Sequence, residues 1–160
     1  MGYIAGTPYV ATEVSMKAGP GGKRGLFTAW NPVQNKKAWD SKEEFPVWRG
    51  ALVTAGGIAF FGTMDRWFKA VDARTGEDLW RFRTGSGVIG PPINCKGPEG
   101  KQFVAIMDGA SGLTGAVVSG QLDPNVPYGA LGFVGAMQDL PRYTGPGGTL
   151  YVFALPGKAP

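Results

Sequence analysis

Residues 70–80, which read AVDARTGEDLW, decide the fold. Residues 68–72 alternate in side-chain character, as do residues 77–84, and this period of two is typical of β-strands. The intervening turn ends at Gly76, which is free to adopt a positive φ, while Asp72 and Thr75 can hydrogen-bond the backbone of the turn. The stretch therefore predicts a β-hairpin that carries the large ring of Trp80 on one face.

The same pattern occurs earlier in the chain, where residues 29–39 read AWNPVQNKKAW. Trp39 maps onto Trp80, so the repeat has an offset of 41 residues. A period near 40 with several short strands per unit is typical of the blades of a β-propeller. We expect both tryptophans to pack between blades, where burying an indole removes about 150–250 Å² from water. That burial is worth about 4–6 kcal/mol before entropy.

The remaining segments fit an all-β plan with one short helix. The helix is expected at 130–140, where Leu131, Val134 and Met137 recur at three-residue spacing and Pro141 follows as a stop. Further strands are expected within residues 50–64 on either side of a turn at 55–57, and at 90–93, 102–107 and 149–155. Nothing resembles a linker between independent domains, so residues 1–160 are expected to form a single unit.

Composition excludes several kinds of chemistry. The 160 residues include 27 Gly, 13 Pro and 12% aromatic residues, which favour short strands and tight turns. There is no histidine, so a Ser-His-Asp or Cys-His pair and a His-ligated zinc site are excluded. Cys95 is the single cysteine, which excludes an internal disulfide within the chain and leaves this thiol without an activating imidazole.

Charge and hydropathy argue against two classes of partner. The formal net charge is +4, and no run reaches five like charges, so we expect no binding to nucleic acid. No stretch approaches the roughly 20 apolar residues of a membrane span. The first residues, MGYIAG, lack the basic and apolar regions of a signal peptide, so we expect none in this chain.

Several motifs resemble, in order, the C-terminal part of the PQQ-dependent methanol and alcohol dehydrogenases, and above all their lanthanide-type branch. The hairpin at 70–80 is similar to the tryptophan-docking motif of these quinoprotein propellers. The other matching stretches are FPVW at 45–48, GALVTAG at 50–56, WFKAVD at 67–72, GSGVIGPP at 85–92 and PGGTLYVFAL at 146–155. The resemblance covers nearly the whole chain.

This resemblance implies the last two to three blades of an eight-bladed propeller, forming a single incomplete domain. It also implies PQQ as the cofactor, a calcium or lanthanide ion, a cytochrome c-type electron acceptor and a periplasmic location for the full-length enzymes. In that family the catalytic Asp and the metal ligands lie in earlier blades. We therefore expect no catalytic residue and no metal ligand in this chain, which is expected to be a fragment without activity of its own.

Three cofactor-contacting positions are implied by the resemblance. Trp48 matches the tryptophan beside the cofactor, while Gly112 and Leu113 match the Gly-Trp pair of a glycine-rich loop. Here that loop, residues 109–115, reads GASGLTG, so leucine replaces tryptophan and supplies no indole N–H. The alternative is a non-enzymatic propeller scaffold of the bacterial envelope built from PQQ-like repeats. Trp48 and the 109–115 loop favour the enzyme.

Two further residues carry expectations, Asp108 for the site and Arg66 for a turn. Asp108 is the carboxylate nearest to the 109–115 loop, and the other aspartates are expected to serve in turns. Arg66 stands where the family pattern has glycine, and a positive φ would strain an arginine. We therefore expect a different turn type at Asp65-Arg66.

Overall fold

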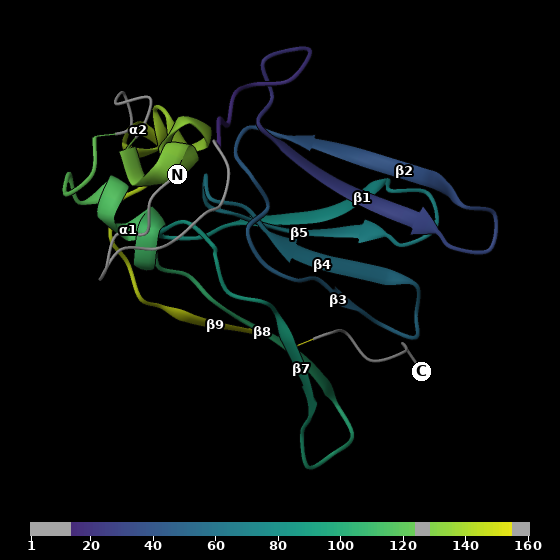
Figure 1. The fold of residues 1–160 in the computed structure, drawn as a ribbon. Helices are drawn as coiled ribbons and strands as arrows, with labels where there is room; N and C mark the ends of the chain where they lie inside the picture. Colours follow the sequence, from purple (N-terminus) through teal and green to yellow (C-terminus); the bar gives the residue numbers. More distant parts are fainter. Residues whose placement is uncertain (1–13, 124–128, 155–160) are drawn as a thin grey trace, which may run out of the picture.

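Three antiparallel β-sheets make up most of the protein in the computed structural model, which describes residues 14–123 and 129–154 (Figure 1). Within these residues the sheets have the strand orders β1-β2, β3-β4-β5-β6 and β7-β8-β9. The strands span Gly25–Asn31 (β1), Lys36–Glu43 (β2), Leu52–Val53 (β3), Ile58–Gly62 (β4), Trp67–Asp72 (β5), Asp78–Arg83 (β6), Ile93–Lys96 (β7), Gln102–Met107 (β8) and Leu150–Ala154 (β9). The all-β expectation is confirmed, although the strand expected at 90–93 begins only at its last residue.

The hairpin β5–β6 forms as the sequence predicts. Asp72 Oδ1 accepts hydrogen bonds from the backbone N–H groups of Arg74 and Thr75 at 2.8 and 2.9 Å. Thr75 Oγ1 accepts from the N–H of Glu77 at 3.3 Å, and Gly76 has a φ of 78°. Side chains within the turn itself therefore define its conformation.

The first repeat forms the hairpin β1–β2, which lies against the face of the four-stranded sheet (Figure 1). Between them is a small core built on the buried residues Ala59, Phe61 and Val71. Phe27 stacks on Phe61 with ring centroids 4.1 Å apart. Alternation along β4 and β5 sends Phe61 and Val71 to this face, because neighbouring residues of a strand point to opposite sides.

The opposite face of the four-stranded sheet packs on the sheet β7-β8-β9. Its buried core consists of Phe60, Phe68, Ala70, Val88, Val104 and Ile106. Trp80 lies at the margin of this core, with its ring 5.1 Å from that of Phe153 and 5.9 Å from that of Phe68. Trp80 therefore contacts the neighbouring sheet, but its side chain is 40% exposed, so the expected burial is only partial.

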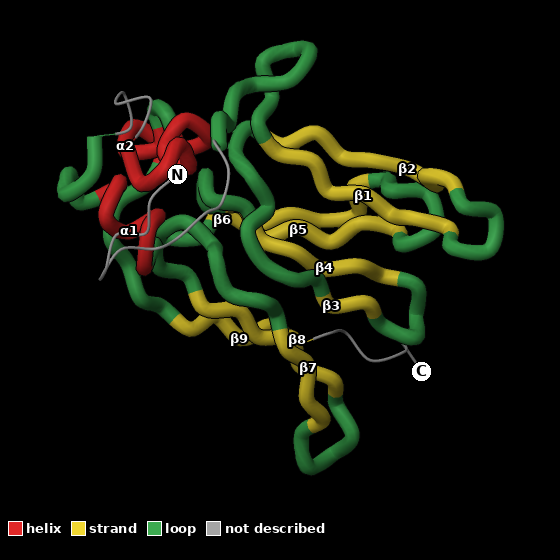
Figure 2. Tube along the Cα trace, in the orientation of Figure 1, coloured by secondary structure: helices red, strands yellow, loops and turns green. Residues whose placement is uncertain are grey.

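The helical segments gather beside the ends of the sheets (Figure 2). They are α1, Gly112–Val118; the 3-10 helix η1, Gly129–Met137; and α2, Leu140–Tyr143. The expectation of one short helix at 130–140 is therefore confirmed only in part, because η1 covers most of that range while α1 and α2 are additional helices. Val134 and Met137 are fully buried, as their spacing predicts, whereas the side chain of Leu131 lies outside the described part. Asp139, with a φ of 69°, separates η1 from α2.

Pro141 does not stop a helix as expected, because it occupies the first turn of α2. A proline is tolerated there, since the N–H that it lacks would have no partner within the helix. Arg66 also differs from expectation. Its φ is 73°, so the arginine itself adopts the left-handed conformation in the turn between β4 and β5. The described residues include no helix that is long and apolar enough to cross a membrane.

Candidate functional site

Trp48 and Leu113, two of the three implied cofactor contacts, lie against the same apolar cluster. Both side chains are partly buried and pack on a core that includes Phe45, Val117 and Leu140. Trp48 lies at this cluster because Phe45, which is fully buried just after β2, anchors residues 46–48. Leu113 belongs to the first turn of α1, whose Val117 is buried in the same core. The fold thus joins residues that are far apart in the sequence.

Gly112, the third implied contact, begins α1 and is exposed, with a φ of 56°. A Cβ at this position would meet no atom within 4 Å, so the space beside it is open. The segment 109–115 is a loop only in its first half, because its second half is helical. Sequence analysis missed this helix, since glycine disfavours helix interiors and α1 depends on buried residues such as Thr114 and Val117.

A cleft of about 300 Å³ borders this cluster. Ile89 belongs both to the apolar core and to the lining of the cleft. The lining also contains Arg49, the residue after Trp48, and Ser111, the residue before Gly112. Arg49 is a functional candidate that sequence analysis missed, because its position directly after Trp48 is not diagnostic by itself. The cleft therefore offers a guanidinium, a hydroxyl and an apolar wall to a small ligand.

Asp108 also lines the cleft, but both of its carboxylate oxygens have partners. Oδ2 accepts from the N–H of Ser86 and Oδ1 from the N–H of Thr149, each at 2.7 Å. The residue is 2% exposed. Asp108 thus ties the segment after β6 to the start of β9, which is a structural role rather than a free acid or base.

A second set of hydrogen bonds reinforces this junction. Thr144 Oγ1 accepts from the N–H of Gly87 at 2.7 Å, and Ser86 Oγ donates to the carbonyl of Gly145 at 2.6 Å. Thr84 Oγ1 donates to the carbonyl of Ser86 at 2.7 Å. Because buried polar groups are costly unless paired, this network holds one wall of the cleft in a defined shape.

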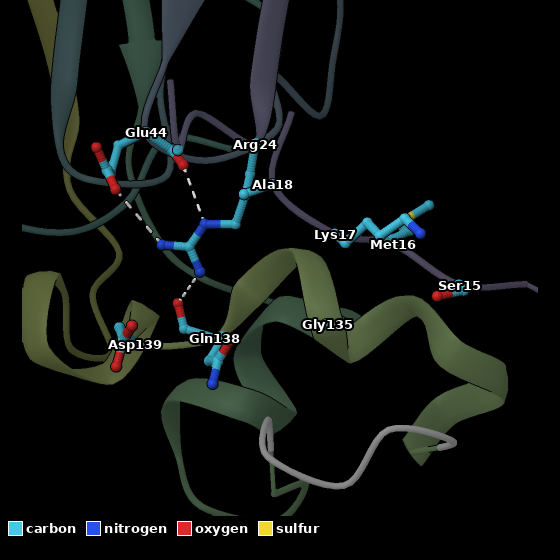
Figure 3. Close-up of a pocket in the computed structure, with 10 residues that line it drawn as sticks. Ser15, Met16, Lys17, Ala18, Arg24, Glu44, Gly135, Gln138 and Asp139 are labelled. Atoms are coloured by element: carbon cyan, nitrogen blue, oxygen red, sulfur yellow. Dashed lines mark hydrogen bonds and ion pairs between the residues drawn. The ribbon is translucent and has the colours of Figure 1, made fainter. Parts of the chain in front are cut away.

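A larger cavity than this cleft, about 530 Å³, lies elsewhere, beside η1 and the segment 15–18 (Figure 3). Arg24 crosses it and donates to the carbonyls of Glu44 and Gln138, as Figure 3 shows. Lys23 and Arg24 both contact the Glu44 carboxylate, and these contacts, the Lys23 hydrogen bond above all, lower the pKa of Glu44. The charged groups are thus satisfied by one another, which indicates that this cavity is a structural junction.

Metal binding finds no support in the part of the chain that the structure describes. There, no group of three or more His, Cys, Asp or Glu side chains is arranged to hold an ion. The least exposed ion pair among the described residues is that of Glu43 with Lys69 at 2.8 Å, which joins β2 to β5.

Comparisons with known proteins agree with this architecture. The lanthanide-dependent methanol dehydrogenase of Methylacidiphilum fumariolicum is 49% identical over 158 residues, which are 96% of this chain and 26% of that enzyme. Methanol dehydrogenase [cytochrome c] subunit 1 of Methylobacterium organophilum is 40% identical over 164 residues. The solved structure of a europium-containing methanol dehydrogenase matches 96% of this chain and 28% of its own length, with a TM-score of 0.84 and 48% identity.

The chain thus spans about a quarter of the length of the curated relatives that it matches. Residues 23–104 match the family described as PQQ glucose/ethanol/alcohol dehydrogenase, β-propeller domain. This range contains the hairpin β1–β2 and the four-stranded sheet, whose strands β5 and β6 form the second hairpin of the repeat. The chain therefore belongs to the PQQ β-propeller family of glucose, ethanol and alcohol dehydrogenases.

Proposed function

We propose that this chain forms the C-terminal blades of a PQQ-dependent alcohol dehydrogenase and one wall of its cofactor channel. The supporting observation is the convergence of Trp48 and Leu113 on one apolar cluster beside the 300 Å³ cleft. Trp48 offers a flat ring to the cofactor and Leu113 an aliphatic contact. Gly112, the residue before Leu113, leaves its own surroundings open, because a Cβ there would meet no atom within 4 Å.

The residues present fit PQQ as an apolar wall. When bound, PQQ supplies the two-electron oxidation of the alcohol. Ile89 would exclude water from one side of the ring system, backed by Trp48 and Leu113, which pack on the same apolar cluster but do not line the cleft. The network around Asp108 holds the cleft in shape. A calcium or lanthanide ion, by analogy with the lanthanide-dependent relative, would be held by the other blades.

The proposal extends to partners and location. The chain would pack against the remaining blades of the parent enzyme and deliver electrons, as part of that enzyme, to a cytochrome c. The name of the Methylobacterium organophilum relative supports this acceptor. We place the assembled enzyme in the periplasm. The scaffold alternative predicts instead a propeller without cofactor, and the two proposals differ in whether Trp48 and Leu113 affect PQQ binding.

A chimera tests the proposal directly. This chain would replace the matching C-terminal quarter of the Methylacidiphilum fumariolicum enzyme, and the purified chimera would be assayed for bound PQQ and dye-linked methanol oxidation. We expect both to be present in the chimera. The isolated 160-residue chain, supplied with PQQ and calcium or a lanthanide, is expected to show no turnover above a control without protein.

Two variants of the chimera separate the channel wall from the scaffold. Leu113→Trp restores an indole and is expected to raise PQQ occupancy, whereas Trp48→Ala is expected to lower it. Trp30→Ala is the matched control, because Trp30 is 56% exposed and lies on β1, away from the cleft. A folded chimera without PQQ, or equal PQQ content in all variants, would favour the scaffold.

A further inference from the structure

Two arginines on the edge strand β6 share a single indole on the neighbouring strand. The guanidinium of Arg83 lies 4.5 Å from the ring centroid of Trp67, and that of Arg81 lies 5.1 Å from the same ring. Trp67 pairs directly with Arg83 across β5 and β6, and Arg81 lies two residues away on the same face. The indole thus holds both cations in place through cation–π contacts.

Neither arginine is neutralised by an acid. Both are exposed, and neither contributes to any of the ion pairs among the described residues. Lys69, the next cation on this face, is already paired with Glu43. Stacking covers the flat face of a guanidinium and leaves its N–H groups at the rim, where they can bind carboxylates in a bidentate manner. Two adjacent positive charges therefore face solvent without a counterion from the part of the chain that the structure describes.

The backbone beside them is also open. β6 is the last strand in the order β3-β4-β5-β6, so within the described residues it pairs on one side only. An edge strand presents unpaired N–H and C=O groups to which an extended segment can add. Side chains two residues apart on a strand lie about 7 Å apart on the same face. An added strand with acids at every second position would therefore place carboxylates opposite Arg81 and Arg83.

We propose that β6 is a docking edge for an extended acidic segment of a partner protein. The segment pairs with the backbone of residues 78–83 and binds Arg81 and Arg83 through carboxylates at alternate positions. A protein segment fits better than a nucleic acid, because a sheet edge offers main-chain hydrogen bonds that only another polypeptide strand can complete. The proposal concerns the outer strand of the sheet and does not depend on the cofactor site.

The test uses the chain captured at low density on a biosensor surface, which limits self-association. The analytes are a short peptide with glutamate at every second position and the same peptide with glutamine instead. We expect the glutamate peptide to bind about tenfold more tightly, in line with the strength of charge-assisted hydrogen bonds. Added salt should weaken this binding, because exposed charges are screened. In hydrogen exchange, amides of residues 78–83 should gain protection when the peptide binds.

Matched variants localise the effect. Arg81→Gln with Arg83→Gln is expected to reduce binding about tenfold. Lys96→Gln with Lys101→Gln removes the same net charge from the exposed β7–β8 hairpin and is expected to leave binding unchanged. Equal losses in both double variants would overturn the proposal. If the arginine variant unfolds, two measurements on the unmodified chain still test the proposal. Peptide binding must weaken with added salt, and the amides of residues 78–83 must gain protection.

Other outcomes would also overturn the proposal. If neither peptide binds, the two arginines only discourage pairing between sheet edges. If a single-stranded oligonucleotide binds the same arginines more tightly than the glutamate peptide does, the surface recognises nucleic acid instead. Protection confined to amides outside residues 78–83 would show that the peptide does not add to the β6 edge.

Discussion

The indole N–H of Trp39 donates a 3.1 Å hydrogen bond to the carbonyl oxygen of Ala73, and this contact joins the two copies of the sequence repeat. The ring comes from β2, and its acceptor lies in the turn between β5 and β6. A single side chain thus links two consecutive sheets by a hydrogen bond. The turn must be narrow to receive it, and Gly76 is the residue that the ring covers.

Gly76→Ala is expected to destabilise the fold by about 3 kcal/mol. A Cβ at Gly76 would lie 2.7 Å from the Trp39 ring, and its φ of +78° strains any L side chain. Left-handed strain costs about 1–2 kcal/mol and overpacking about 1–3 kcal/mol. Gly57→Ala is the matched control, because Gly57 has a φ of +79° with nothing within 4 Å. Equal urea midpoints for the two variants would contradict close packing of Trp39 on the turn.

Trp80→Ala is expected to cost about 2–3 kcal/mol, less than the 3–5 kcal/mol of a fully buried aromatic ring. The reason is that 40% of the side chain is exposed, although its ring contacts those of Phe68 and Phe153. In urea unfolding, Phe68→Ala should lower the unfolding free energy more than Trp80→Ala does, and both should lower it more than Lys36→Ala does. A Trp80 variant no less stable than the Lys36 variant would show that these ring contacts contribute nothing.

The hairpin could be predicted from sequence because its determinants are local. Asp72 and Gly76 act within the turn itself, so spacing alone reveals them. The exposure of Trp80 depends instead on which sheet covers it, and no local pattern carries that information. Arg66 keeps a positive φ because the surrounding turn dictates it: its N–H donates to the carbonyl of Thr63 and its carbonyl accepts from the N–H of Thr84.

The candidate site was predictable only through resemblance. Trp48 and Leu113 are apolar residues without a chemical signature, and their convergence arises from packing on Phe45 and Val117. Arg49 escaped notice because a single arginine next to a tryptophan has no diagnostic spacing. Sequence proximity suggested that Asp108 lay near the site. Its structural role could not be predicted from sequence, because it depends on where the fold places the N–H groups of Ser86 and Thr149.

Asp108→Asn is expected to destabilise the fold by about 1–3 kcal/mol. An asparagine has one carbonyl oxygen, so its NH₂ group would face one of the two N–H donors that now bind the carboxylate. Asp78→Asn is the control, since Asp78 is exposed on β6. The comparison is made by urea unfolding at neutral pH. Identical stabilities would mean that the carboxylate does not hold β9 to the segment after β6.

Acid is expected to weaken the β5–β6 turn through Asp72. The N–H groups of Thr75 and Arg74 lower the pKa of this carboxyl below 3.8. Its contribution to stability is therefore present above the unfolded pKa and is lost as the pH falls through the folded pKa. Between about pH 5 and pH 2.5, Asp72→Asn should lose less stability than the unmodified chain, whereas Glu99→Gln should lose as much. Parallel curves for all three proteins would contradict this role.

The isolated chain is expected to self-associate in solution. β9 is an edge strand, and its residues Leu150 and Val152 are 57% and 56% exposed on the same face. Exposed apolar residues on an unpaired strand recruit other chains, and a net charge of +4 is too small to prevent this. Size exclusion with light scattering at micromolar concentration should therefore give masses well above 16.8 kDa.

Substitutions on β9 test whether this edge is responsible for the association. Leu150→Lys with Val152→Lys places two charges on the exposed face of the strand, and we expect this variant to shift toward the monomer. Val33→Lys is the control, because Val33 is 93% exposed in the turn between β1 and β2 and belongs to no sheet edge. The control should associate like the unmodified chain, since a single added charge does not block strand pairing. A sharp 16.8 kDa peak for the unmodified chain would show that its exposed strands do not recruit further copies.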